Sequence, residues 1–485
     1  MSTSKILPYE KLIIFILGLV MLMEFIDVSV LNTSLPQIGY SLRVNPIDLK
    51  VALTVYLLAL GSFIPAASWV ADRFGVRKVL LIAISGFLLS SIACGLSTNL
   101  CMLTIARGAQ GICGAFISPV ARLMVLYLFK ARLAEVMAKI VPIFLLGPLL
   151  GPLLGGAITT QLNWRFIFFV NVPVGLFSLI MIRCYFADYK SDAPKRFDLI
   201  GFLLLAFALG AALFTIDTLT LPTLSIMQKG LFIVMSLALF FAYYRHYRKT
   251  TVPIINLAVF LNKQYAYFSF LLVMIMLFCM NMGFIGPLYV QTHYHYSAFA
   301  SGLLVAPMVI GALISKRTLP LLQARLSLRA LLTLLLLISM ITLIVLGFSM
   351  LYFNVWLFAL LLLINGWCAG QLMPIIAQAL YQDLGKEIVG TASVVNSAIR
   401  QLAQGFAIAM IALILILTSK QPSLNWDTAL PNISYAVVMF FSAAMVLIAI
   451  GSLYMLMPKQ EVVAQQQAQL NAPQATENTK GSSNK

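Results

Sequence analysis

The chain has 485 residues, of which 61% are hydrophobic and 10% are charged, and its formal net charge is +17. So much apolar surface excludes a soluble globular protein of this length and indicates a chain that crosses a lipid bilayer many times. The basic residues fall in short loops between apolar runs, and not on one soluble face, which excludes a nucleic-acid-binding protein. We therefore expect the lipid bilayer, and no nucleic acid, among its partners.

Fourteen apolar segments are long enough to be membrane helices. They cover residues 11–33, 49–71, 79–97, 100–129, 138–160, 164–186, 198–217, 227–245, 263–289, 298–315, 330–350, 355–380, 388–418 and 434–457. An even number places both termini on one side, and the more basic alternate loops identify that side as the cytoplasm. The sequence therefore predicts an all-α, multi-pass membrane protein with both termini cytoplasmic.

The polar loops divide these segments into two groups of six with a pair of helices between them. We expect an N-terminal six-helix bundle over residues 1–197, two inserted linker helices over 198–250 and a C-terminal six-helix bundle over 251–457. Residues 458–485 are rich in Gln, Ala and Asn, which is typical of a disordered tail.

Two carboxylates, Glu24 and Asp27, lie three residues apart in the first segment and therefore on one face of a helix. Counted from its start, they lie about 20 and 24 Å into an apolar core about 30 Å thick. Ionised carboxylates are costly at that depth, so each needs a watery cavity, a partner or a proton. Burial also makes a carboxylate easier to protonate, so both are candidates for proton coupling or substrate binding, and a structural buried carboxylate is the alternative.

The loop after the second segment reads SWVADRFGVRK over residues 68–78. One acid among three bases in a tight turn can lock two helix ends by charge pairs and release them on a small rotation. A basic loop that only sets the orientation in the membrane is the alternative.

The fourth segment contains Arg107, three residues before Gln110. Counted from Leu100, Arg107 lies about 10 Å below the outer edge of the membrane, near the depth of the two carboxylates. A guanidinium beside a carboxylate favours its ionised form, so moving the two apart would trigger proton uptake. A structural polar contact is the alternative.

The fifth segment contains the run GPLLGPLLGG over residues 147–156. Gly147, Gly151 and Gly155 are four residues apart and form a groove without side chains, into which another helix can pack. Tight helix packing alone explains the glycines, but not the repeated Gly-Pro pairs at 147–148 and 151–152.

The last charge within a membrane segment is Arg400, about 18 Å into the thirteenth segment, where it needs an acceptor. Arg122 falls near the cytoplasmic end of the fourth segment, where we expect it to anchor the helix at the membrane surface. The six cysteines lack metal-ligand or disulfide spacing, so we expect no metal and no cofactor.

Several of these stretches resemble motifs of the major facilitator superfamily, in its fourteen-helix drug:proton antiporter branch (the EmrB/QacA-like multidrug exporters). In the loop over 68–78, Ser68 replaces the usual glycine, and the matching residues are Asp72, Arg73, Gly75, Arg77 and Lys78. The first helix matches at Asp27, Asn32 and Pro36, and the fourth at Arg107, Gln110 and Gly111. The fifth is similar to the antiporter motif, with Gly147, Gly151, Pro152, Gly155 and Gly156 matching. The stretches over 163–175 and 390–402 are also similar to this branch.

The resemblance implies a major facilitator fold and a proton-coupled antiporter that exports lipophilic or cationic drugs across the bacterial inner membrane by alternating access. Asp27, Arg107, Gln110, Asn32 and Arg400, together with Glu24, are then the candidates for proton coupling and substrate binding. The Asp72 loop would secure the outward-facing state, and the glycine groove would seal the closed interface. Small molecules and protons are the implied ligands, with a monomer or a periplasmic adaptor complex as the assembly.

The nearest alternative is an exporter of one physiological metabolite, such as a siderophore, an organic acid or an amino acid. An enzyme is not expected, because no cluster of His, Asp or Ser lies at a membrane mouth. A nucleotide-driven pump is disfavoured, because the sequence has no Gly-x-x-x-x-Gly-Lys-Ser/Thr loop.

Overall fold

The computed structural model describes residues 8–456 apart from gaps at 46–47, 130–131, 133–135, 138, 141–142, 144–145, 191–196, 220–224, 252, 353, 383, 385 and 419–431. Apart from one short 3-10 helix, η2 (Leu257–Leu261), the elements of this described part are α-helices, as expected for a chain whose backbone must satisfy its own hydrogen bonds in lipid. The predicted tail over 458–485 lies outside the described residues.

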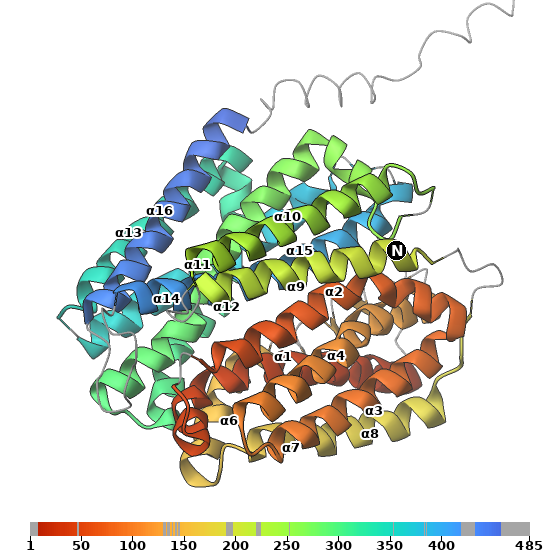
Figure 1. Cartoon of the computed structure of the whole chain (residues 1–485), viewed down its shortest axis with the longest axis horizontal. Helices are drawn as coiled ribbons and strands as arrows, with labels where there is room; N and C mark the ends of the chain where they lie inside the picture. The colour runs from red at the N-terminus through yellow and green to blue at the C-terminus, as the bar shows by residue number, and fades with distance from the viewer. Residues whose placement is uncertain are drawn as a thin grey trace, which may run out of the picture.

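The helices fall into an earlier and a later group, which we call the N-terminal and the C-terminal helices. The N-terminal helices are α1 (Pro8–Leu42), α2 (Lys50–Phe74), α3 (Val76–Gly95), α4 (Leu100–Leu128), α6 (Gly147–Gln161), α7 (Phe166–Phe169) and α8 (Asn171–Tyr185). The C-terminal helices are α11 (Lys263–Tyr294), α12 (Ala298–Arg325), α13 (Leu328–Ser349), α14 (Val355–Tyr381), α15 (Lys386–Thr418) and α16 (Asn432–Leu456). In Figure 1 the first group fills one half of the molecule and the second group the other.

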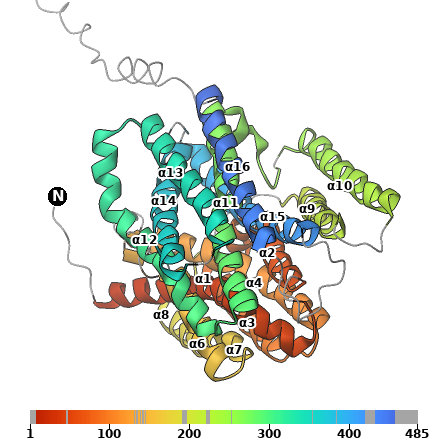
Figure 2. The ribbon, with the colours of Figure 1, turned by 90° about the vertical axis from the view of Figure 1, so that its left-hand side faces the viewer.

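Two further helices, α9 (Leu199–Leu219) and α10 (Ile226–Tyr247), connect the groups. They pack on each other, and α9 also packs on α2 and α15. Figure 2 shows the pair at one side of the molecule with α10 outermost. Large apolar side chains of α10, such as Leu231, Val234 and Leu237, are exposed, as suits a helix surrounded by lipid.

The fourteen predicted spans correspond to the observed helices in chain order. Thirteen stretches of the described residues are long and apolar enough to cross a membrane, and α7 and α8 together make one of them. The fifth predicted span holds α6, a helix of 15 residues preceded by positions outside the described part. The predicted all-α, multi-pass architecture is therefore confirmed.

Local sequence explains where several helices begin. Asn99, Ser225, Ser297 and Ser327 precede the first turns of α4, α10, α12 and α13, and each side chain accepts a hydrogen bond from a backbone N–H of that turn. These caps satisfy donors that the helix itself leaves free.

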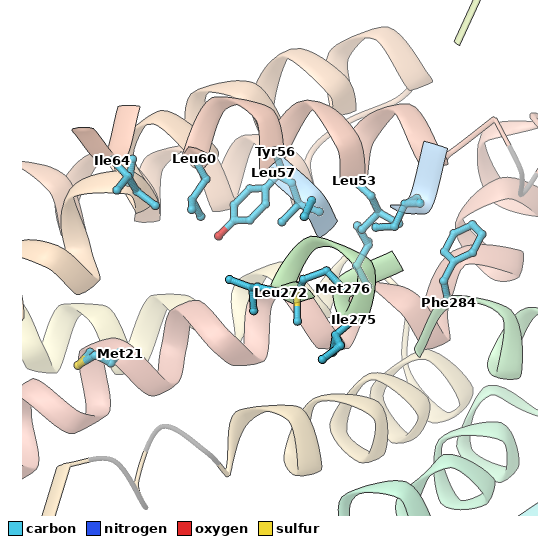
Figure 3. Close-up of a cluster of buried hydrophobic side chains, with 14 of the residues drawn as sticks. Met21, Leu53, Tyr56, Leu57, Leu60, Ile64, Leu272, Ile275, Met276 and Phe284 are labelled. Carbon is cyan, nitrogen blue, oxygen red and sulfur yellow. The ribbon is translucent and has the colours of Figure 1, made fainter. Parts of the chain in front are cut away.

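The core continues across the boundary between the two groups. Figure 3 shows buried apolar side chains of α2, among them Leu57, Leu60 and Ile64, gathered with Leu272 and Met276 of α11. Burying a side chain of this size contributes roughly 1.5–3 kcal/mol relative to exposing it to water. Lipid is itself apolar, so moving a side chain from lipid into the protein gains little of this free energy. Close packing between the helices therefore contributes more to stability in a membrane.

Candidate substrate and proton site

Asp27 lies at the centre of a buried hydrogen-bond network between α1, α4 and α8. Arg107 Nη1 donates to its Oδ2 at 2.6 Å, while Gln110 Nε2 and Asn171 Nδ2 donate to its Oδ1 at 2.9 and 2.7 Å. The side chains of Arg107 and Asp27 are 0% and 1% exposed. The depths counted from the sequence predicted Arg107 near the two carboxylates, and the structure places it on Asp27.

Arg107 is only partly satisfied by this network. Its Nη1 also donates to Gln110 Oε1 at 2.7 Å, and its guanidinium carbon lies 4.3 Å from the centre of the Tyr56 ring. Its Nε and Nη2 are buried and have no hydrogen-bond partner among the described residues. A buried donor without a hydrogen-bond partner is unfavourable. Because Asp27 and Gln110 provide the hydrogen bonds that hold Arg107, a change in the charge of Asp27 would change where Arg107 lies.

Glu24 lies one helical turn before Asp27 and has different neighbours. The hydroxyl of Ser118 in α4 donates to Glu24 Oε2. Arg122 of α4 and Arg400 of α15 line the same small cavity as Glu24. The sequence predicted that Arg122 anchors the helix at the membrane surface, but the structure places its half-buried side chain on the wall of this cavity, beside Glu24.

A cavity of about 320 Å³ lies between the N-terminal and the C-terminal helices. Most of its wall is apolar, with Phe25, Leu57, Met276 and Phe284 among the residues that line it. Its polar lining includes Glu24, Asn32, Arg107 and Arg400, whereas Asp27 lies behind Arg107 and does not line it. An apolar cavity with a few polar groups is typical of a binding site for a small organic molecule.

Arg400 is the charged residue that the described C-terminal helices contribute to the cavity wall. The sequence predicted an acceptor for its guanidinium. Within the described part of the chain, no residue accepts a hydrogen bond from Arg400 or forms an ion pair with it.

The glycines of the motif in α6 face two different helices. A Cβ atom at Gly147, Gly151 or Gly155 would meet Phe25, Ser29 or Val30 of α1. A Cβ atom at Gly156 would meet the carbonyl oxygen of Ala298 in α12. Three glycines therefore allow close packing within the N-terminal helices, and Gly156 allows it between the two groups.

The two groups are joined at the end of the molecule where α1, α6 and α11 finish and α12 begins, which we call the Gln291 end. Gln291 Nε2 donates to the backbone oxygen of Thr33 at 2.8 Å, and Gln37 Nε2 donates to Gln291 Oε1 at 2.9 Å. The backbone N–H of Phe299 donates to Thr160 Oγ1 at 3.1 Å. These contacts hold the two groups together at this end.

The Asp72 loop lies at the opposite end, between α2 and α3. Gly75 has a φ of 100°, a conformation that glycine adopts without strain, and a Cβ there would lie 2.6 Å from the carboxylate of Asp188. Asp188 also accepts a hydrogen bond from the backbone N–H of Arg77 at 3.0 Å, and Arg77 Nη1 donates to the backbone oxygen of Phe186 at 2.8 Å. Asp72 accepts from the hydroxyl of Tyr127 at 3.5 Å, and Arg73 and Lys78 are exposed.

Sequence reasoning did not find four residues of the site, namely Tyr56, Ser118, Asn171 and Asp188. Asn171 carried a signal, because a polar residue stands in an otherwise apolar stretch after position 166, but its partner is 144 positions away. No cluster of three or more His, Cys, Asp or Glu able to hold a metal occurs among the residues described.

The profile of the family described as Major Facilitator Superfamily matches residues 17–408, most of the chain. The chain belongs to this superfamily. It is therefore a transporter and not an enzyme, and the resemblance seen in its motifs is confirmed.

Two curated bacterial relatives are named as multidrug resistance proteins. The "Putative multidrug resistance protein MdtD" of Citrobacter koseri is 28% identical over 410 residues, covering 82% of this chain and 85% of the relative. The protein of the same name from Cronobacter sakazakii is 29% identical over 402 residues, covering 81% and 83%.

Solved structures show the same fold at low identity. A POT family transporter in complex with a thioalcohol conjugated peptide superposes with a TM-score of 0.67 at 15% identity, covering 92% of this chain and 96% of that one. The nucleoside transporter NupG gives a TM-score of 0.61 at 10% identity, covering 92% and 98%.

Proposed function

We propose that this protein is a proton-coupled antiporter that exports lipophilic drugs and related compounds across a bacterial inner membrane. The observation that carries the proposal is the buried Asp27–Arg107 pair, whose arginine forms part of the wall of the central cavity. The multidrug resistance name of the bacterial relatives supports drugs as the substrate class and the inner membrane as the location.

The chemistry of the pair supports proton coupling. A proton on Asp27 would remove the charge that Arg107, Gln110 and Asn171 hold in place. Arg107 would then lose its ion pair and reorient toward the cavity, which changes how the cavity receives a substrate. A proton on Asp27 would in this way change the charge at the cavity wall, which couples protonation to substrate binding.

Alternating access requires the two groups of helices to separate at one end while they close at the other. The contacts of Gln37, Gln291 and Phe299 would break when the cavity opens at the Gln291 end. Gly156 allows the two groups to approach there, and the Asp72 loop would secure the opposite end. With both termini cytoplasmic, the Gln291 end is the periplasmic one.

The proposed cycle divides the chain as the sequence predicts, into bundles over 1–197 and 251–457 with linker helices over 198–250. The cycle needs no partner beyond substrate, protons and bilayer, so we propose a monomer, with a periplasmic adaptor as the one candidate partner. Export of a single metabolite is the second candidate, and Arg400 favours an organic acid among the metabolites considered.

Transport by the purified protein in proteoliposomes tests the proposal. A pH gradient would be imposed, and proton movement recorded on adding lipophilic cations, organic acids or siderophores. We expect at least one compound to move protons across membranes that contain the protein and not across protein-free membranes. Transport of a compound without any proton movement would contradict antiport.

A further inference from the structure

Two half-buried guanidinium groups, those of Arg122 and Arg400, lie close enough to interact electrostatically. Both face the small cavity beside Glu24. Among the residues described, none forms a hydrogen bond or an ion pair with either of them. A guanidinium away from bulk water is unfavourable unless an anion or several acceptors surround it.

The charges around the cavity are not balanced. Asp27 forms an ion pair with Arg107, with 2.6 Å between Oδ2 and Nη1, so that pair has no net charge. Glu24 is the one acidic side chain among the described residues that line either cavity, and it faces both Arg122 and Arg400. With Glu24 ionised, these three residues carry a net charge of +1, which favours an anion over a cation.

We propose that these two adjoining cavities together bind amphipathic organic anions. The anionic group lies on Arg400, which lines both cavities, and on Arg122 of the small one, while the apolar body lies in the 320 Å³ cavity against Phe25, Leu57 and Phe284. This inference rests on the proposed function, since it names the substrate class of the same cavity. The planar guanidinium of arginine matches a carboxylate, sulfonate or phosphate group in geometry as well as in charge. Asn32, whose buried Oδ1 has no partner among the described residues, provides an acceptor farther along the wall.

The arrangement assigns different roles to the two carboxylates of α1. Ionised Glu24 and the anionic group of a ligand interact with the same two arginines, so they compete. Removing the charge of Glu24 therefore strengthens the binding of an anion and weakens the binding of a cation. Glu24 then contributes to the choice between anions and cations, whereas Asp27 and Arg107 remain the proposed coupling pair.

Binding of three naphthalene derivatives with one apolar body tests the proposal. The probes are 2-naphthoate, its neutral amide and (2-naphthylmethyl)ammonium, measured by equilibrium dialysis against the purified full-length protein in a non-ionic detergent. We expect wild-type protein to bind the carboxylate at least tenfold more tightly than either other probe. Equal binding of the three, tighter binding of the ammonium, or no binding of the carboxylate would overturn the proposal.

Variants locate the contact. Arg400→Met should weaken naphthoate binding by about 10- to 100-fold, the range for losing a hydrogen bond to a charged group. Arg317→Met makes the same change at an exposed position of α12 and should leave binding as in the wild type. Naphthoate binding that survives Arg400→Met would contradict the assignment.

Glu24→Gln is expected to increase the affinity for naphthoate, a result that misfolding of the variant could not produce. We expect it to tighten naphthoate binding and to weaken ammonium binding, each by several-fold. The opposite pair of changes would show that Glu24 is a cation site and would overturn the proposal. Ligand binding to the protein in detergent needs no proton gradient, so these results are independent of the proteoliposome test. Antiport can fail in that test while anion binding is observed, and antiport can be observed while anion binding fails.

Discussion

The N-terminal helices hold a paired carboxylate behind the wall of the central cavity, whereas the C-terminal helices contribute an arginine to that wall. At Asp27 the N-terminal helices satisfy a buried carboxylate with three side-chain donors, from Arg107, Gln110 and Asn171. Across the cavity, α15 presents Arg400, which forms no hydrogen bond with any described residue. The network around Asp27 can be paired or broken, which suits coupling, whereas an arginine with no hydrogen bond to a described residue suits binding a ligand.

The same contrast separates Glu24 from Asp27, one turn apart on α1. Asp27 lies behind Arg107, and Glu24 lines the cavity. Helical spacing places both carboxylates on one face of α1. One turn of helix nevertheless separates Asp27, in the buried hydrogen-bond network, from Glu24, at the cavity wall.

The largest expected effect comes from removing the arginine of the closed network. Arg107→Met leaves Asp27 buried and charged, which should lower the free energy of unfolding by about 3–5 kcal/mol. Thermal unfolding of the purified protein in detergent measures the change. The double variant Arg107→Met, Asp27→Leu should recover most of the loss. A single variant as stable as the wild type would show that the pair is not a closed, desolvated unit.

Two neighbouring glycines separate packing within the N-terminal helices from packing between the groups. In Gly155→Ala the new Cβ would lie 2.5 Å from the backbone oxygen of Val30 in α1, so we expect a loss of about 1–3 kcal/mol in stability. In Gly156→Ala it would meet the backbone oxygen of Ala298 in α12, so the two groups should separate at the Gln291 end.

Spin labels at the exposed positions Tyr40 and Leu303 report that separation. We expect the distance distribution to shift to longer values in Gly156→Ala and to stay as in the wild type in Gly155→Ala. Identical distributions in all three proteins would mean that Gly156 does not control the closure of this end.

A smaller effect is expected from Asn171. Asn171→Ala removes one donor to Asp27 and leaves Arg107 and Gln110 in place, so we expect stability to fall by about 1–2 kcal/mol. Proton-driven transport should be slowed but not lost. Ser178→Ala, also in α8 but outside the network, is the control. Complete loss of transport in Asn171→Ala would make Asn171 as important to coupling as Asp27.

The smallest effect is expected far from the cavity. Asp198 lies 2.7 Å from His246 Nε2 and accepts a hydrogen bond from the backbone N–H of Ile254 at 3.2 Å, so it ties the start of α9 to the end of α10. Asp198→Asn should lower stability by about 1 kcal/mol and leave transport within about twofold of the wild type. Strongly impaired transport at full stability would show that α9 and α10 take part in the transport cycle.

Much of this arrangement could be predicted from the sequence. Apolar length determined the fourteen helices, because lipid leaves the backbone few alternatives. Depth counting placed Arg107 near Asp27 because helix rise is constant. The glycine spacing in α6 predicted a close contact with another helix, and α1 fills three of those positions.

The remainder depended on how the helices are rotated against one another. Nothing in the local sequence of α4 tells whether Arg122 faces the membrane surface or Glu24. Asn171 and Asp188 meet their partners only after α8 has packed on α1 and α3. The sequence predicted a hydrogen-bond acceptor for Arg400. The structure instead places Arg400 at the wall of the cavity between the two groups, where no described residue accepts a hydrogen bond from it.

The most direct test of proton coupling at Asp27 compares two modes of transport by Asp27→Asn. Substrate exchange between the two sides of a proteoliposome membrane needs binding and alternating access, whereas accumulation driven by a pH gradient needs proton coupling as well. A labelled compound found to be transported by the wild type would be measured in both modes. We predict that Asp27→Asn retains exchange and loses gradient-driven accumulation. Gradient-driven accumulation at the wild-type level in Asp27→Asn would contradict a coupling role for this carboxylate.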